Sequence, residues 1–268
     1  MINKNKTERN FSLIFTFARI ITVFTRTALL FLVIMLDEIG LESKNLALLL
    51  TIGPTLILLT NLDYHQDYYK LFFSDTKTNF TLAKNFSNYT NFYFGFVPIL
   101  YITAVIILFF LFKSFFISFL YAIVVSGEKI YDEFQRFTIF NKNYKLWSLV
   151  GILEFVTPAL ITILSHLLFE TSIVNTYVAI SAVVNLLMLS FIIIHSKYIY
   201  ILRSKRFKWI LYNILKSTRI YFGRINYVLI NFISGHVLIV SRYFVLALDS
   251  IFFPVFVLLL NISNIIVF

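Results

Sequence analysis

Apolar segments long enough to cross a lipid bilayer recur along this chain of 268 residues. A helix rises about 1.5 Å per residue, so roughly 20 apolar residues span the hydrocarbon layer of a membrane. Six runs approach or exceed that length, at 11–36, 46–62, 146–169, 173–195, 225–247 and 250–268. Because 59% of the residues are hydrophobic and only 13% are charged, the sequence predicts an all-α integral membrane protein.

A further apolar stretch, residues 92–125, is too long for a single crossing. As one straight helix it would extend roughly 50 Å, which exceeds the thickness of a bilayer. Lys113 is its main interruption. We therefore expect a helical hairpin that turns at Lys113 and Ser114, which brings the prediction to about eight transmembrane helices.

The positions of the Lys and Arg residues predict the orientation. If the N-terminus is cytoplasmic, the cytoplasmic segments are 1–10, 63–90, 128–145 and 196–224. They hold 18 of the 23 Lys and Arg residues, whereas the outer turns hold only Lys44 and Lys113. Such a split is typical of the positive-inside rule. It predicts that both ends are cytoplasmic, and it explains the net charge of +10 without a nucleic-acid partner.

A basic segment divides the predicted helices unequally. Within 196–224, apolar residues recur at helical spacing among Lys and Arg residues. This pattern favours an amphipathic helix on the inner membrane face over the alternative, a simple charged loop. We therefore expect a six-helix transmembrane lobe at 1–195, a cytoplasmic linker at 196–224, and two helices of an incomplete second lobe at 225–268.

Four ionisable side chains inside the predicted spans are candidates for substrate binding, because such groups are costly in a membrane. Arg19 and Arg26 share one face of the first helix. Arg26 lies near mid-membrane, where it faces either a water-filled cavity that suits a phosphate ligand or a carboxylate in a structural ion pair. Glu154 is either a partner for one of these arginines or a proton-coupling group. Arg242, near the outer end of its helix, completes the set.

Signals of enzymatic chemistry are weak or missing in the sequence. It contains no Gly-rich phosphate loop, no Gly-x-Ser-x-Gly elbow and no metal-ligand spacing, and it has no cysteine. The segments between the spans are under about 30 residues, which is too short for a soluble catalytic domain. We therefore expect a protein that is not an enzyme and that has no catalytic residues, no metal and no cofactor.

Two turns and one helix carry a resemblance to a known family. The acidic turn at 36–41 (Leu-Asp-Glu-Ile-Gly-Leu) and the helix exit at 61–67 (Asn-Leu-Asp-Tyr-His-Gln-Asp) resemble the start of bacterial lipid-linked oligosaccharide flippases. These are the O-antigen and capsule repeat-unit exporters of the polysaccharide biosynthesis family, within the multidrug/oligosaccharidyl-lipid/polysaccharide exporter superfamily. Residues 240–244 are also similar to a family pattern with an Asp-Arg pair, although Ser241 replaces the acid.

The resemblance implies a transporter of the bacterial plasma membrane. In that family two six-helix lobes, joined by a cytoplasmic amphipathic linker, enclose a cationic cavity for an undecaprenyl-diphosphate-linked sugar chain. Arg26 matches a cavity arginine of the first helix. Family members have twelve or fourteen helices, so this chain resembles a flippase that is truncated after helix eight or completed by a second chain. Two alternatives remain: a membrane enzyme of surface-glycan assembly, such as a polymerase or acyltransferase, and a non-catalytic accessory subunit.

Overall fold

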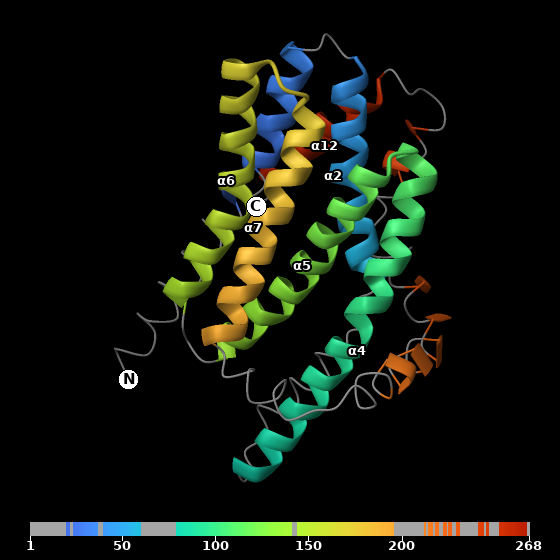
Figure 1. The fold of residues 1–268 in the computed structure, drawn as a ribbon, viewed down its shortest axis with the longest axis vertical. Coiled ribbons are helices and arrows are strands. Elements are labelled where there is room, and N and C mark those ends of the chain that lie inside the picture. Colours follow the sequence, from blue (N-terminus) through green and yellow to red (C-terminus); the bar gives the residue numbers. More distant parts are fainter. Residues whose placement is uncertain are drawn as a thin grey trace.

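The regular structure of the protein is helical throughout the described residues, which confirms the all-α prediction. The computed structural model describes residues 20–21, 24–36, 40–59, 79–140, 144–195 and 252–266, and scattered positions within 212–230 and 241–246. An apolar first helix, Phe24–Leu36, precedes the labelled helices of Figure 1. These are α2 (Leu41–Leu59), α4 (Asn79–Phe112), α5 (Phe115–Phe140), α6 (Tyr144–Phe169), α7 (Ile173–His195) and α12 (Phe253–Ile266).

The predicted hairpin is present, and it turns where the sequence indicated. α4 ends at Phe112 and α5 begins at Phe115. Lys113 has a left-handed φ of 52°, and its N–H donates to the Phe109 carbonyl at 3.0 Å, which closes the last turn of α4. The Ser114 hydroxyl then accepts a hydrogen bond from the Ile117 N–H at 3.4 Å. Ser114 thus caps the N-terminus of α5.

The turn between α6 and α7 is built in the same way and is also tied to α2. Glu170 has a left-handed φ of 51°, and Ser172 accepts from the Asn175 N–H at 3.4 Å. The Glu42 carboxylate accepts both the Ser172 hydroxyl and the Val174 N–H, each at 2.8 Å. A carboxylate at a helix N-terminus satisfies free donors and complements the helix dipole. Glu42 therefore fixes α2 against the start of α7.

Replacing Glu42 by alanine should lower the free energy of unfolding by about 1–2 kcal/mol, because two charge-assisted hydrogen bonds are lost. The measurement is denaturant-induced unfolding of the purified protein in detergent micelles. Glu170→Ala is the matched control, since it removes a carboxylate from an exposed position of the same turn. Equal stability of the two variants would contradict the capping role of Glu42.

Successive described helices run in alternating directions through the bundle. The end of the first helix, the start of α2, and the turns between α4 and α5 and between α6 and α7 all lie towards one end of the bundle in Figure 1. We call this end the hairpin end. α5 runs diagonally through the bundle and packs against α4, α7, α2 and α6, while α12 packs on α2. The buried core lies among these helices and the first helix.

Three glycines allow close approach between helices in this core. A Cβ at each would lie 2.3–2.7 Å from a polar atom of a neighbouring helix. Gly53 of α2 faces the Tyr121 hydroxyl, Gly127 of α5 faces the Asn185 amide, and Gly151 of α6 faces the Tyr131 hydroxyl. Small residues at helix contacts, filled by polar side chains from the partner, are characteristic of packing in membranes. They place α5 at the centre of the bundle.

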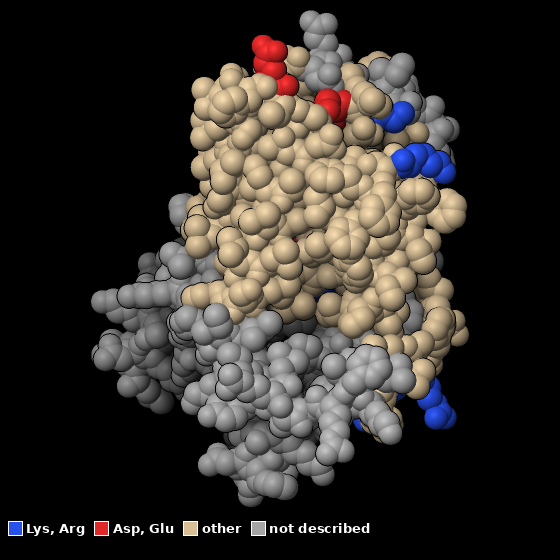
Figure 2. Space-filling view, in the orientation of Figure 1, with Lys and Arg blue, Asp and Glu red and all other residues tan. Residues whose placement is uncertain are grey.

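Apolar side chains cover the outside of the bundle. Gly151–Phe169 and Ile173–Phe191 are long and apolar enough to cross a membrane, and Phe24–Leu36 and Phe96–Phe112 are shorter apolar helices. Only 22% and 39% of the residues in the two long segments are buried, whereas the core helix of a soluble protein is mostly buried. In Figure 2 the charged side chains of the described surface lie towards its two ends, with an uncharged band between them. These features associate the protein with a membrane; the eight crossings stay a prediction.

Two helices extend further than the predicted crossings. The segment 128–145 was assigned to the cytoplasm, but α5 continues to Phe140, and α4 already begins at Asn79 within the segment 63–90. The reassigned part of α5 includes Lys129, which is fully buried. The predicted linker helix lies mostly outside the described residues, and its described positions are helical.

Candidate functional site: a polar layer between the helices

Two consecutive charged residues, Glu128 and Lys129, lie in the buried middle of α5. The apolar stretch that begins this helix leads directly into Ser126 and Gly127, and the missing side chain of Gly127 lets α7 approach at Asn185. Lys129 has no exposed surface. Charges in such a position are expensive unless they are paired, and they are therefore rarely incidental.

Charged groups from three helices lie at a similar depth in the bundle. Arg26 is 10 residues from the end of the first helix at Leu36, Glu128 is 13 from the start of α5, and Glu154 is 15 from the end of α6. These spacings correspond to roughly 15, 20 and 22 Å along the respective helix axes, and Glu128 lies at a smaller depth than its spacing because α5 is inclined. The three side chains therefore form one polar layer, which would lie inside the hydrocarbon region of a bilayer.

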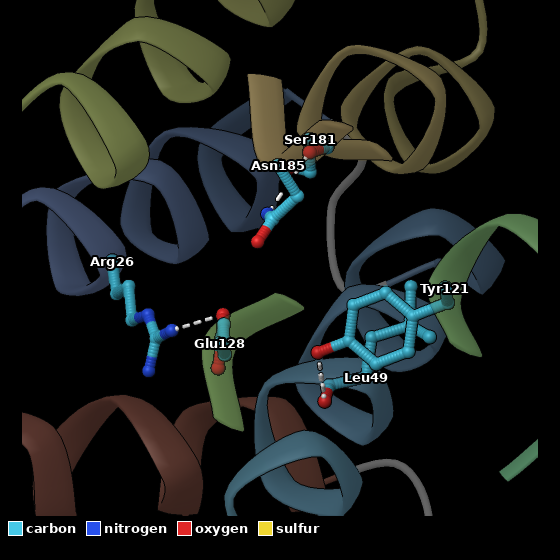
Figure 3. Close-up of polar contacts among 6 residues, drawn as sticks. All are labelled: Arg26, Leu49, Tyr121, Glu128, Ser181 and Asn185. Carbon is cyan, nitrogen blue, oxygen red and sulfur yellow. Dashed lines mark hydrogen bonds and ion pairs between the residues drawn. The ribbon is translucent and has the colours of Figure 1, made fainter. Parts of the chain in front are cut away.

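An ion pair between Arg26 and Glu128 forms the centre of this layer. Nη2 of Arg26 donates to Oε1 of Glu128 at 2.7 Å, and Figure 3 shows the two side chains pointing toward one another. The guanidinium carbon lies 4.4 Å from the ring centroid of Phe155, in a cation–π contact. The structure thus gives Arg26 a partner, and it is Glu128 rather than Glu154, which the sequence had offered.

The ion pair is still accessible. The side chains of Arg26 and Glu128 keep 22% and 12% of their surface exposed, while Glu154 is 3% exposed. Arg26 Nε is buried and finds no hydrogen-bond acceptor among the described residues. A guanidinium has five N–H donors, so the Glu128 carboxylate leaves part of its binding capacity unused.

Polar side chains from α5, α6 and α7 surround the pair. Glu154, Tyr121 and Tyr177 lie close enough to act electrostatically on the guanidinium. Asn185 donates its amide to the Ser181 carbonyl at 3.0 Å, and in Figure 3 its side chain is directed into the same interhelical space. Tyr121 is held by a 2.7 Å hydrogen bond to the Leu49 carbonyl. Polar side chains from three helices therefore surround the Arg26–Glu128 ion pair.

Arg242 belongs to the same region. It is 7% exposed and lies close enough to Arg26 for their charges to interact. Its neighbour Tyr243 donates a hydrogen bond to Oγ1 of Thr55 in α2 at 2.7 Å, which anchors this segment to the bundle. The structure therefore brings together Arg26, Glu154 and Arg242 of the four predicted residues. Arg19 lies outside the described residues.

Sequence reasoning missed Glu128 and Lys129 because it ended the helix at the first charges after an apolar run. A signal that could have found them is the apolar spacing of Ile130, Phe134 and Phe137, which continues the helical period past those charges. Reading the helix through this segment would have placed both charges inside the bundle.

The Arg26 guanidinium is a group that can bind an anion. The described residues hold no group of three or more His, Cys, Asp or Glu residues that could bind a metal ion. A guanidinium at a partly enclosed position binds oxyanions such as phosphate through parallel hydrogen bonds. No protein-family model, no curated protein and no solved structure matches the chain.

Proposed function

We propose that the protein is a multi-pass transporter of the bacterial plasma membrane that moves a diphosphate-linked lipid saccharide across the bilayer, as oligosaccharide flippases do. The observation that carries this proposal is Arg26, a partly exposed guanidinium paired with a single carboxylate inside a bundle with an apolar surface. A buried ion pair adds little stability to such a bundle, so a charge at this position indicates a functional role. The resemblance of the sequence to that family supports the same function.

The polar layer offers what a diphosphate group requires. Arg26 provides a planar fork of donors, and Arg242 adds positive charge to the same region. Tyr121, Tyr177 and Asn185 supply neutral polar groups nearby. Phosphate oxygens held by arginine forks in a medium of low dielectric constant bind more strongly than they do in water. The lipid chain of the substrate would remain in the bilayer, against the apolar surface of the helices.

Complementation tests the proposed function. The chain is expressed in a bacterium that lacks its own O-antigen flippase, alone and together with a candidate partner chain, and surface glycan is measured by antibody labelling. The proposal expects surface glycan to be restored in at least one of these two arrangements. If neither restores it while the protein accumulates in the membrane, transport of this substrate class is contradicted.

Cysteine labelling tests the orientation, because the chain contains no cysteine of its own. Lys113→Cys, at the exposed turn between α4 and α5, should react with an impermeant maleimide in intact cells. Lys216→Cys, an exposed position in the predicted linker, should react only after the membrane is permeabilised. The reverse pattern would show that the orientation derived from the basic residues is inverted.

A further inference from the structure

The Glu128 carboxylate occupies the part of Arg26 that a phosphate oxygen would use. We propose that Glu128 is an internal competitor for the anionic ligand of Arg26, so that a diphosphate group binds by displacing this carboxylate. The inference rests on the proposed function, because it concerns the same binding site. In this proposal Glu128 determines which anions can bind Arg26.

The geometry distinguishes Glu128 from the other buried carboxylate of the layer. Glu128 contacts the guanidinium directly at 2.7 Å, whereas Glu154 acts on it only electrostatically among the interactions described here. The ion pair keeps exposed surface on both side chains. An incoming anion can therefore reach the exposed part of the Arg26 side chain beside Glu128.

The competitor has a physical purpose. An isolated guanidinium in a bundle surrounded by lipid is costly, and a paired carboxylate reduces that cost while the site has no ligand. A ligand must then bind Arg26 better than a single carboxylate does. A diphosphate, with more charge and several oxygens, meets this condition, whereas a ligand with one carboxylate does not. Competition of this kind gives specificity at the expense of affinity.

Binding measurements on the full chain in detergent micelles test the inference. The probes are farnesyl diphosphate and inorganic pyrophosphate, titrated by isothermal calorimetry. Glu128→Gln should bind at least about tenfold more tightly than the wild type, since the couplings measured for close charge pairs correspond to that factor or more. Glu170→Gln, which removes a carboxylate from an exposed turn, is the matched control and should leave the affinity unchanged.

Glu128→Asp covers the case in which Glu128→Gln fails to fold. The aspartate keeps the charge, but its carboxylate lies one methylene further from Arg26, which weakens the ion pair. Because the weaker pair is easier to displace, this variant should bind the probes about threefold more tightly than the wild type. If the Glu128 variants bind farnesyl diphosphate more tightly than the wild type does but bind pyrophosphate equally well, the ligand of the site is a lipid headgroup. Equal gains with pyrophosphate assign it to the diphosphate group itself.

Two outcomes separate this inference from the function on which it rests. If Arg26→Gln abolishes binding but the Glu128 variants that fold bind no better than the wild type, the competitor role is overturned and the anion site survives. If Arg26→Gln binds as well as the wild type, both the site and the competitor role are overturned. Absence of binding in every folded variant also overturns both.

Discussion

Replacing Gly127 by alanine should destabilise the protein by about 3 kcal/mol, at the upper end of the cost of overpacking a core. A Cβ at this position would lie 2.3 Å from Oδ1, 2.9 Å from Cγ and 3.0 Å from Cβ of Asn185. Rotation of the amide cannot relieve the contact with Cβ, which the backbone of α7 positions. α5 and α7 would have to separate, and the polar layer would open with them. Unfolding in mixed micelles, followed by circular dichroism, measures the change.

Gly223 supplies the matched control for Gly127. It is also helical, and a Cβ there would meet no atom of the described residues within 4 Å. Alanine at Gly223 should therefore be neutral or stabilise the helix by up to about 1 kcal/mol. Adding Asn185→Ala to Gly127→Ala removes the two closest atoms and should restore part of the stability. Equal stability of the Gly127 and Gly223 variants would mean that the α5–α7 contact is not as close as described.

Replacing Arg26 by alanine in a version of the protein that supports export should reduce surface glycan at least tenfold, because an arginine–phosphate pair contributes more than the roughly 1.4 kcal/mol that a factor of ten requires. Arg26→Lys keeps the charge but lacks the planar fork, so we expect an intermediate loss. The measurement is surface glycan per amount of membrane-inserted protein, which separates transport from accumulation.

Two comparisons make the Arg26 result specific. Lys216→Ala removes a positive charge from an exposed position and should leave export unchanged. Arg26→Ala combined with Glu128→Ala removes both members of the ion pair, so it restores stability without restoring a phosphate ligand, and export should stay low. Full export by the single or the double variant would show that Arg26 has no part in substrate binding.

The polar layer links these two predictions. Gly127 precedes Glu128 in α5 and faces Asn185, so the same turn of helix sets the α5–α7 distance and carries the partner of Arg26. A disturbance of the packing at Gly127 therefore also displaces Glu128. We expect Gly127→Ala to alter anion binding as well as stability, whereas Gly223→Ala alters neither.

The sequence by itself determined the class of fold and one turn. Apolar runs of about 20 residues indicate helices, whose backbone hydrogen bonds are made within the segment, and the length of residues 92–125 required the turn found at Lys113 and Ser114. It also identified Arg26 as a candidate functional residue, because a charge inside an apolar segment of this length is costly unless it is paired.

Only the tertiary structure decided which groups surround that charge. Glu128 lies 102 residues from Arg26 in the chain, and their contact depends on how the first helix and α5 are rotated and on how closely their neighbours pack. Hydropathy carries no information on either quantity. The approach of α7 at Gly127 and the anchoring of Tyr243 on Thr55 are pairwise contacts between distant segments. They turn charges scattered in the sequence into one layer.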